Sequence, residues 1–393
     1  MWDGPAIAGR FRYDAGDNSA RDIYREGMGV LTSIVGQPIS ELDTPALLVD
    51  LDILEANIAQ MASDIKDRGA SWRPHSKANK SPVIGHRELR AGAIGITCAK
   101  LGEAEVLVAS GIFDILISNQ IVGPIKTRRL AWINRQDGVD VKCCVDSLVN
   151  VQEIAAAGRE AGVTVRVLIE INSGMERAGV LPQNALALAK EIHALEGIEL
   201  AGLMTWEGHA MAYTDFEERS EVVKRSIALV LDAQEEIEAA GIPIKIVSVG
   251  GTGTYLISAA IEGVTEIQAG GGIWGDQMYI DLHANVKPAL ELVVTVTSRP
   301  TPNRVIFDAG RKTVDPSNRA PIPVGLEIEK IALSAEHGTL ILSEESETPA
   351  VGDRLHFRIG YSDQIMHLHE ALFGVRNGIV EQVIPVAGRG RLQ

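Results

Sequence analysis

A short basic segment carries the residue types needed for amine chemistry. It runs from Arg73 through Pro74 and His75 to Lys77, and Lys80 follows closely. Pro74 cannot donate the hydrogen bond of a central strand, so the apolar run before it ends here. A lysine at such a place forms an imine with a carbonyl compound when burial and neighbouring cations lower its pKa. Arg73, His75 and Lys80 are candidate neighbours, and a solvated basic turn is the competing interpretation.

Two glycine-rich turns follow apolar runs later in the chain. The first contains Ser248, Gly250, Gly251, Thr252 and Gly253, and the second contains Gln268, Gly270 and Gly271. Glycine lets the backbone approach a ligand closely, and N–H groups at a helix N-terminus bind phosphate. Either turn alone is typical of an ordinary loop. Two such turns after successive strands predict a phosphate site.

An arginine lies in a third loop of the same kind. Arg177 follows the apolar run 164–171 and is flanked by Gly174 and Gly179. Its guanidinium can donate to an acceptor atom of a bound ring, although a surface arginine is the alternative. A lysine, a phosphate cradle and an arginine at one site together predict pyridoxal 5′-phosphate. Lys77 then forms the imine, and Arg177 meets the pyridine nitrogen.

Apolar, β-branched runs alternate with helical segments from Thr44 to about residue 285, which predicts parallel β/α units. The strand candidates are 46–51, 71–75, 93–98, 113–118, 139–145, 164–171, 199–205, 244–249 and 265–268. The helix candidates are 53–67, 101–109, 147–161, 183–195, 215–240 and 254–262. About eight units fit a (β/α)₈ TIM barrel, with an open doubly wound sheet as the alternative. In a barrel all three loops lie at the strands' C-terminal ends, where active sites form.

The alternation of apolar runs with helical segments ends at about residue 285. Short runs at 290–297, 304–308, 326–333, 339–343, 354–359 and 379–385 are separated by Gly, Pro or acidic turns. This spacing predicts an all-β C-terminal domain over 286–393. The resulting division is an N-terminal arm at 1–40, a barrel at 41–285 and the β domain, which part of the arm could join.

Composition narrows the function classes. The 393 residues contain 37 Lys and Arg against 52 Asp and Glu, a formal charge of −15, which argues against nucleic-acid binding. No apolar run approaches the length of a membrane span, and the N-terminus lacks a signal peptide's basic start and apolar core. The three cysteines, Cys98, Cys143 and Cys144, do not form a disulfide framework. We therefore expect a cytoplasmic protein with a small-molecule substrate, no nucleic acid and no membrane partner.

From about Asp43 onward the chain resembles the fold-type III pyridoxal-phosphate enzymes. Within them it is similar to the D-threonine aldolase, D-3-hydroxyaspartate aldolase and D-serine dehydratase group, whose barrel is alanine racemase-like. The resemblance rests on TPALLVDLD at 44–52, RPH-x-K at 73–77 and SxGGTG at 248–253. It implies that Lys77 carries the cofactor, Arg177 faces its ring nitrogen, and both glycine turns hold its phosphate. It also implies a head-to-tail homodimer with active sites at the subunit interface.

The resemblance also implies a divalent-metal site (Mg, Mn or Zn), and here the chain departs from it. The family's metal ligands are a histidine followed two residues later by Cys or Asp. Tyr361 stands at the histidine position, and Asp363 keeps the second ligand. One interpretation is that His367 or His369 replaces the missing nitrogen, and another is that the site needs no metal and Tyr361 transfers a proton. The remaining interpretation is that His367 and His369 are ordinary residues of the β domain and bind no metal.

A second departure is Trp206 to His209, where His209 is a candidate acid or base. The leading prediction is a lyase that cleaves Cα–Cβ of a D-β-hydroxy amino acid, giving an aldehyde and glycine or a similar amino acid. The predicted catalytic residues are Lys77, His209 and Tyr361. The alternatives are a dehydratase (ammonia-lyase), a racemase, a cofactor carrier without a reaction, and a phosphosugar barrel in which Lys77 is structural.

Overall fold

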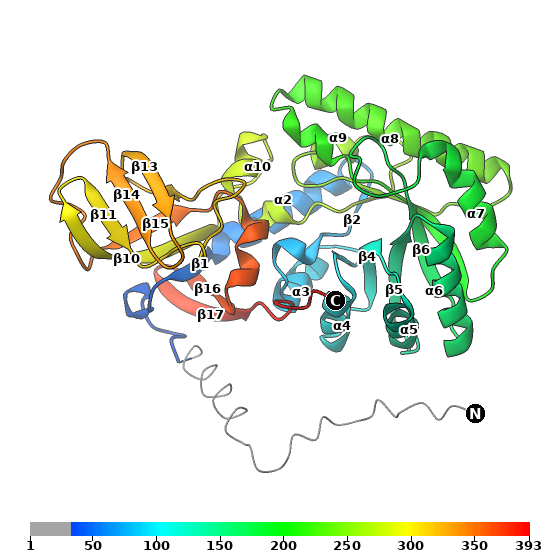
Figure 1. Cartoon of the computed structure of the whole chain (residues 1–393), viewed down its shortest axis with the longest axis horizontal. Coiled ribbons are helices and arrows are strands. Elements are labelled where there is room, and N and C mark those ends of the chain that lie inside the picture. Colours follow the sequence, from blue (N-terminus) through cyan, green and yellow to red (C-terminus); the bar gives the residue numbers. More distant parts are fainter. Residues whose placement is uncertain (1–32) are drawn as a thin grey trace, which may run out of the picture.

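The computed structural model describes residues 33–393, which form two domains lying side by side (Figure 1). Residues 1–32 of the expected N-terminal arm lie outside the described residues. The described end of the arm packs on the β domain, because Pro38 bridges to Ile379 and Gly36 N–H donates to the Val380 carbonyl.

The larger domain is built on a parallel sheet of eight strands, in the order β2-β9-β8-β7-β6-β5-β4-β3. A parallel bridge between His75 and Thr97 brings the two end strands together. This confirms the predicted TIM-like barrel, which is followed by an all-β domain. The strands are β2 (Ser71–Trp72), β3 (Ile96–Cys98), β4 (Asp114–Gln120), β5 (Asp140–Val145), β6 (Val165–Glu170), β7 (Ile198–Met204), β8 (Ile246–Val249) and β9 (Glu266–Ile267).

Helices cover the outside of this sheet (Figure 1). They are α2 (Leu51–Lys66), α3 (Pro82–Arg90), α4 (Leu101–Ala109), α5 (Pro124–Ile133), α6 (Leu148–Ala161), α7 (Ala185–His193), α8 (Phe216–Ala239), α9 (Tyr255–Ser258) and α10 (Gln277–Asp281). Helices α3 and α5 were not among the helix candidates from the sequence. Both begin with proline at the first helical position, where the missing N–H costs nothing, so proline is a start signal here.

The second domain is a mainly antiparallel sheet with the path β13-β14-β11-β10-β1-β16-β17. Its strands are β1 (Ala46–Asp50), β10 (Leu290–Thr301), β11 (Arg304–Phe307), β12 (Ile322–Pro323), β13 (Ile328–Leu333), β14 (Gly338–Leu342), β15 (Arg354–Arg358), β16 (Ala371–Arg376) and β17 (Ile379–Pro385). Two short 3₁₀ turns, η6 (Ser362–Gln364) and η7 (Met366–Leu368), precede β16. They bring Tyr361 and Asp363 toward the barrel.

One predicted barrel strand belongs to this second sheet. The run at 46–50, expected to open the barrel, pairs antiparallel with β10 and parallel with β16. The barrel therefore begins at α2, after Asp50 caps that helix by accepting from the N–H of Ile53. An apolar run indicates burial in a sheet but not which sheet, because pairing is decided by strands far away in the chain.

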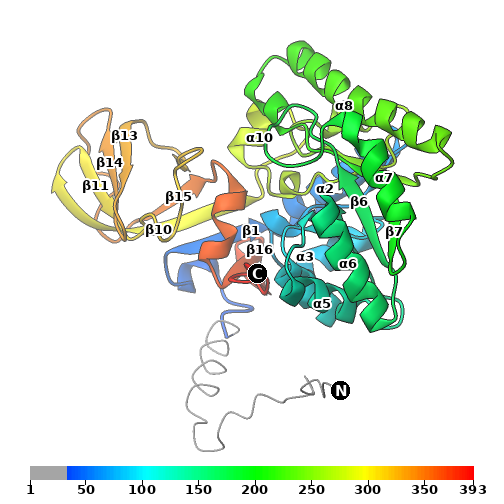
Figure 2. The same ribbon diagram turned by 45° about the vertical axis from the view of Figure 1, so that its right-hand side comes forward.

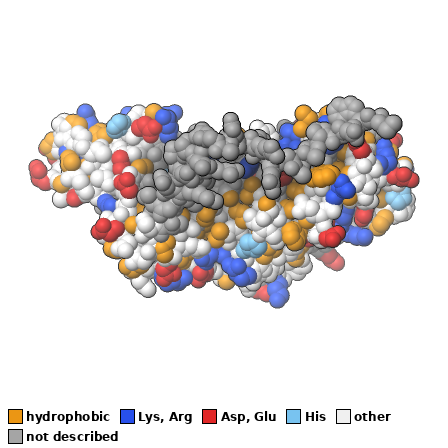
Figure 3. Space-filling view, turned by 90° about the horizontal axis from the view of Figure 1, so that it is seen from below, with side chains coloured by type: hydrophobic (Ala, Val, Ile, Leu, Met, Phe, Trp, Pro, Cys, Tyr) orange, Lys and Arg blue, Asp and Glu red, His pale blue; other side chains and the backbone are white. Residues whose placement is uncertain are grey.

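Helix α10 joins the two domains beside the barrel opening. In both views it lies between barrel and β domain (Figures 1 and 2). Its N–H groups at Gln277 and Met278 donate to the carbonyls of Ile359 and Gly360, just after β15. The lower face of the molecule carries both charge signs with hydrophobic side chains between them (Figure 3). Within residues 33–393, no helix combines the length and apolar character of a membrane span.

Candidate active site

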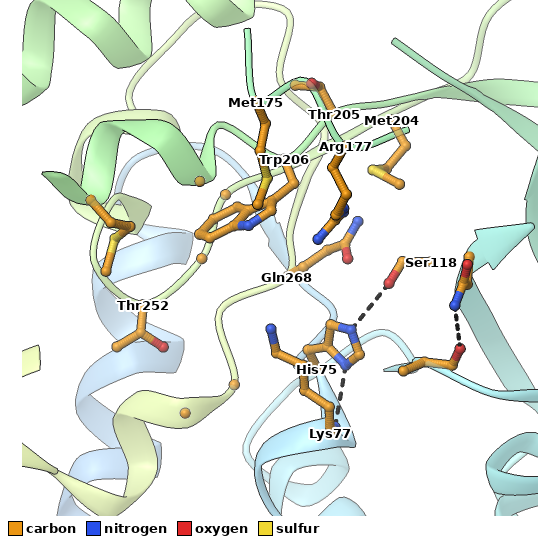
Figure 4. A pocket seen from close by; sticks show the side chains of 18 of the residues that line it. His75, Lys77, Ser118, Met175, Arg177, Met204, Thr205, Trp206, Thr252 and Gln268 are labelled. Carbon is orange, nitrogen blue, oxygen red and sulfur yellow. Dashed lines mark hydrogen bonds between the residues drawn. The ribbon is translucent and has the colours of Figure 1, made fainter. Parts of the chain in front are cut away.

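A cavity of about 560 Å³ opens at the C-terminal ends of the barrel strands and is bordered by the β domain (Figure 4). It brings together most of the residues predicted from sequence. Those lining it are His75, Lys77, Arg177, Gly250, Gly251, Thr252, Gln268, Gly270, Gly271 and Tyr361. Segments that are far apart in sequence thus meet at one mouth, as the barrel topology requires.

Lys77 lies on a short 3₁₀ turn, η2 (Ser76–Ala78), directly after β2. Two contacts hold this turn. The Lys77 N–H donates to His75 Nδ1 at 3.2 Å, and the buried Trp274 indole donates to the Ala78 carbonyl at 2.8 Å. The Lys77 side chain remains 42% exposed, and its Nζ lies 3.4 Å from Asp363 Oδ2. The amine is therefore accessible from the cavity and faces a carboxylate.

His75 is held as a neutral ring. Its Nδ1 accepts from the Lys77 N–H, so the proton sits on Nε2, which lies 3.1 Å from Ser118 Oγ (Figure 4). Burial lowers the pKa of His75 well below its usual value, and the charges of Lys77, Lys80 and Arg177 lower it further. The ring thus supports the Lys77 turn without adding positive charge.

Arg73 does not act as the neighbouring cation expected from the sequence. Its buried guanidinium pairs with Glu266 at 2.9 Å and Asp114 at 2.7 Å, within the barrel. Successive side chains of a strand point to opposite faces, so the Arg73 side chain need not point toward the same side as Lys77. Lys80, the other expected neighbouring cation, pairs its amine with Glu103.

Arg177 is positioned by a buried carboxylate. Glu170, the last residue of β6, lies 3.5 Å from the Arg177 guanidinium and accepts from Gln120 Nε2 at 2.6 Å. Burial is the main influence on Glu170, and it raises the pKa of this carboxyl. Half of the Arg177 side chain remains exposed at the cavity. It can therefore donate to a ring acceptor while Glu170 fixes its direction.

The two glycine turns lie against each other. The Gly272 N–H donates to Thr252 Oγ1 at 3.0 Å, linking the second turn to the first. Gln268, which lines the cavity, donates from Nε2 to the buried Ser248 Oγ at 2.9 Å. Four backbone N–H groups at this place have no hydrogen-bond acceptor within residues 33–393. They are those of Thr252, Gly253, Gly270 and Gly271. Such a set suits a phosphate group.

The β domain contributes a carboxylate and a phenol on the other side of Lys77. Tyr361 donates to Asp363 Oδ2 at 2.9 Å, while Asp363 Oδ1 is buried and has no partner among the described residues. Burial and the charge of Asp363 raise the pKa of Tyr361 far above its usual range. The phenol therefore stays protonated and donates its hydrogen bond to Asp363.

A buried acid ties this segment to the barrel. Asp276 Oδ2 accepts from the Ser362 N–H at 2.8 Å and from its hydroxyl at 2.7 Å. Asp276 Oδ1 accepts from the N–H of Tyr279, whose ring packs edge-on to Tyr361 at 6.0 Å. Burial raises the pKa of Asp276 to about 7. This contact fixes where Tyr361 and Asp363 stand relative to Lys77.

His209 does not line the cavity. Its Nε2 lies 3.2 Å from Ser226 Oγ of α8, and its ring packs against Gly174. A histidine in a loop after a strand can point either into the barrel mouth or out toward a helix, and here it points to α8. We therefore do not carry the candidate acid–base role of His209 forward.

The residues around Asp363 do not fit a protein-held divalent metal. His369 Nε2 is bonded to the Thr313 carbonyl at 2.9 Å, and Tyr361 rather than a nitrogen ligand contacts Asp363. In the described part of the chain, no group of three or more His, Cys, Asp or Glu side chains converges as metal ligands would. A single carboxylate that is already paired with a lysine is a poor donor set for such an ion.

Several residues at the site were missed by the sequence analysis. They are Gln120, Glu170, Glu207, Asp276 and Tyr279, together with Ser118. Glu170 and Glu207 belong to segments that were singled out, but a carboxylate next to an apolar run is usually a surface residue. The burial and hydrogen-bond partners that show its structural role are visible only in the folded protein.

The cavity fits pyridoxal 5′-phosphate. The Lys77 amine, Arg177, and three N–H groups without an acceptor within residues 33–393, those of Thr252, Gly270 and Gly271, belong to residues that line one cavity. The glycines leave the backbone bare where the cofactor must approach. A Cβ on Gly270 would lie 2.4 Å from the His75 carbonyl oxygen, so a side chain has no room there.

Comparisons with known proteins agree with this geometry. Residues 49–278 match the family model described as alanine racemase, N-terminal domain, and residues 289–375 match a putative serine dehydratase domain. D-threonine aldolase of an Arthrobacter species is 35% identical over 361 residues, covering 90% of this chain and 95% of the relative. 3-hydroxy-D-aspartate aldolase of Paracoccus denitrificans (strain Pd 1222) is 31% identical over 373 residues, covering 92% and 96%.

Solved structures give the same result. The crystal structure of D-threonine aldolase from Filomicrobium marinum superposes with a TM-score of 0.88 at 30% identity, covering 91% of this chain and 99% of that one. D-threo-3-hydroxyaspartate dehydratase from Delftia sp. HT23 gives 0.80 at 29% identity, covering 88% and 98%. The chain therefore belongs to the alanine racemase-like, pyridoxal-phosphate-dependent family that includes the D-threonine and 3-hydroxy-D-aspartate aldolases.

Proposed function

We propose that the protein is a lyase that splits Cα–Cβ of a D-β-hydroxy amino acid into an aldehyde and glycine or a similar amino acid. Support comes from relatives named as aldolases that are matched over nearly their whole length. The observation that carries the proposal is the pair of Lys77 Nζ and Asp363 Oδ2, 3.4 Å apart at the cavity. It places a covalent attachment point beside a proton acceptor.

Each residue of the site has one task in this reaction. Bound pyridoxal phosphate supplies an electron sink for the electron pair left at Cα. Lys77 would hold the cofactor through its amine. Arg177 would donate to the ring nitrogen and, because a guanidinium does not readily lose its proton, would leave that nitrogen unprotonated. Asp363 accepts the proton of the substrate β-hydroxyl, and Tyr361 orients Asp363 through its hydrogen bond.

The test is a panel of D- and L-β-hydroxy amino acids offered to the purified protein, with products identified by mass spectrometry. An aldehyde together with glycine, formed from the D-isomers only, supports the proposal. A keto acid with ammonia would assign the chain to the dehydratases. Exchange of deuterium at Cα without any product would indicate a racemase. Either of these two results overturns the lyase assignment.

We also propose that this reaction runs without a divalent metal held by Asp363. The support is the donor set, in which Asp363 is paired with Lys77 and Tyr361 rather than with nitrogen ligands. Turnover after dialysis against a chelator, with metal content measured on the same sample, tests this. We expect unchanged turnover with less than one metal ion per ten chains. Loss of turnover that Mn²⁺, Mg²⁺ or Zn²⁺ restores would refute the idea.

We further propose a homodimer located in the cytoplasm. Exposed apolar side chains follow the C-terminal ends of β4, β5 and β6: Val122 (50%) and Leu181 (47%) in loops, and Ile125 (69%) and Val149 (61%) in the first turns of α5 and α6. An apolar rim of this kind is typical of an interface. Light scattering on the eluting protein should give twice the chain mass, and Ile125→Glu should shift it toward the monomer. The three buried free cysteines are consistent with a reducing compartment, which cell fractionation can check.

A further inference from the structure

A buried carboxylate stands directly behind the first glycine turn. Glu207 follows β7 and is completely buried. Its Oε1 accepts from the Thr254 hydroxyl at 2.8 Å and the Ser258 hydroxyl at 2.7 Å. Its Oε2 accepts from the Gly250 N–H at 3.3 Å. One side chain from the β7–α8 connection thus binds both ends of the turn and the helix α9 that follows.

These bonds divide the donors of the turn into two groups. Glu207 occupies the Gly250 N–H, and the Thr254 hydroxyl also accepts from the Gly251 N–H at 3.1 Å. The next two N–H groups, of Thr252 and Gly253, have no acceptor within residues 33–393. The carboxylate therefore engages the Gly250 end of the turn and leaves the N–H groups of Thr252, which lines the cavity, and of its neighbour Gly253 for a ligand.

The residues around Glu207 shape the same turn by contact. A Cβ on Gly251 would lie 2.3 Å from the Trp206 ring, and a Cβ on Gly253 would lie 2.3 Å from the Met211 sulfur. Trp206 and Met211 also line the cavity. The glycine turn therefore packs directly against the segment 206–211. Glu207 is the only acidic side chain of that segment.

We propose that Glu207 is a positioning residue for the cofactor phosphate. It holds the turn 250–254 so that the N–H groups of Thr252 and Gly253 converge with those of Gly270 and Gly271 on one phosphate group. A loop that is ordered before binding loses less conformational entropy when the ligand arrives, which strengthens binding. The role concerns the phosphate alone and does not depend on which reaction the enzyme catalyses.

The test compares two ligands on the full-length chain after removal of bound cofactor: pyridoxal 5′-phosphate and pyridoxal. Both carry the aldehyde that reacts with Lys77, so the ratio of their dissociation constants isolates the phosphate contribution. In Glu207→Gln an amide replaces the carboxylate. Its NH₂ group then faces a hydrogen-bond donor at a place where a carboxylate oxygen accepted before. We expect pyridoxal 5′-phosphate to bind ~10–100-fold more weakly while pyridoxal binding changes by less than ~3-fold. Titration followed by absorbance gives both constants.

Two further variants keep the result interpretable. Ser258→Ala removes only one donor to Glu207, and we expect a smaller loss of the same kind, ~3–10-fold. Glu88→Gln changes another fully buried carboxyl, which lies in α3 and has no hydrogen-bond partner among the described residues. It should leave the ratio of the two constants unchanged. Equal weakening of both ligands in Glu207→Gln, or no weakening, would overturn the proposal, since a general loss of stability cannot distinguish the two ligands.

Discussion

The two sides of the cavity are built in different ways. The phosphate side consists of backbone N–H groups on two glycine turns, backed by buried contacts within the barrel. The side that faces the substrate consists of three side chains, Lys77, Tyr361 and Asp363, and two of them come from the β domain. Under the proposed function, the backbone donors bind the phosphate of the cofactor, and the side chains at the domain junction act on the substrate.

This difference also appears in how each side is held. The phosphate side stays within one domain, and its glycines contact Trp206 and the His75 backbone directly. The reaction side depends on links across the junction, from Asp276 to Ser362 and from the N–H groups of Gln277 and Met278 to the carbonyls just after β15. Changes at the phosphate side should therefore alter cofactor affinity, and changes at the reaction side should alter turnover. The following variants test that division.

Lys77→Ala should have the largest effect. Without its amine the cofactor cannot be attached, and we expect turnover to fall by at least ~1,000-fold with loss of the imine absorption band. Lys190→Ala, at an exposed position of α7, is the matched control and should keep both. A Lys77→Ala protein with an unchanged cofactor spectrum would show that this lysine is structural.

Asp363→Asn should be next. The amide keeps the size of the side chain but cannot accept a proton, so we expect kcat to fall ~100–1,000-fold. Affinity for pyridoxal phosphate should change by less than ~3-fold, because Asp363 does not contact the glycine turns. Tyr361→Phe, which removes only the orienting hydrogen bond, should cost less. Steady-state kinetics and cofactor titration measure both quantities, and unchanged kcat in Asp363→Asn contradicts its role as proton acceptor.

Gly251→Ala should lower the affinity for the cofactor and leave turnover nearly unchanged. Its new Cβ meets the rigid Trp206 ring at 2.3 Å, so the turn must move and cofactor affinity should fall ~10-fold or more. Gly253→Ala is the companion variant, because its Cβ meets the flexible end of Met211 and the loss should be milder. Turnover at saturating cofactor should stay within ~3-fold of wild type in both. If saturating cofactor does not restore turnover, the proposed division between the two sides fails.

Asp276 provides the smallest effect, a pH dependence of stability. Its folded pKa is about 7, above its usual value of 3.8, so between those pH values the folded protein keeps a proton that the unfolded chain has released. This carboxyl therefore lowers the free energy of unfolding as pH rises from about 4 to 7, by on the order of 1 kcal/mol per pH unit, and adds no further slope above that range. Urea denaturation at several pH values should show this slope in wild type and lose it in Asp276→Asn. An equal slope in both proteins would argue against Asp276 as its source.

Much of the site was predictable because its parts are local. Lys77 after a proline-ended strand, Arg177 in a glycine-flanked loop, and the two glycine turns each carry their signal within a few neighbouring residues. The barrel then brings strand ends to one edge, and the structure shows these residues lining one cavity. The predictions that did not hold required knowledge of distant partners. Strand 46–50 pairs with β10 and β16, Arg73 pairs with Glu266 and Asp114, and His209 points to Ser226.

The sequence by itself determined the chemistry that is available, since residue types and short spacings specify an amine, a guanidinium and bare backbone at the ends of strands. The alternation of apolar runs and helical segments also determined the barrel that collects them. Only the tertiary structure decided what each group faces. Asp363 meets Lys77 because β-domain pairing and the Asp276 contact carry it there, and Glu207 holds a turn more than 40 residues away. Such long-range contacts arise when distant segments pack together, and no local pattern encodes them.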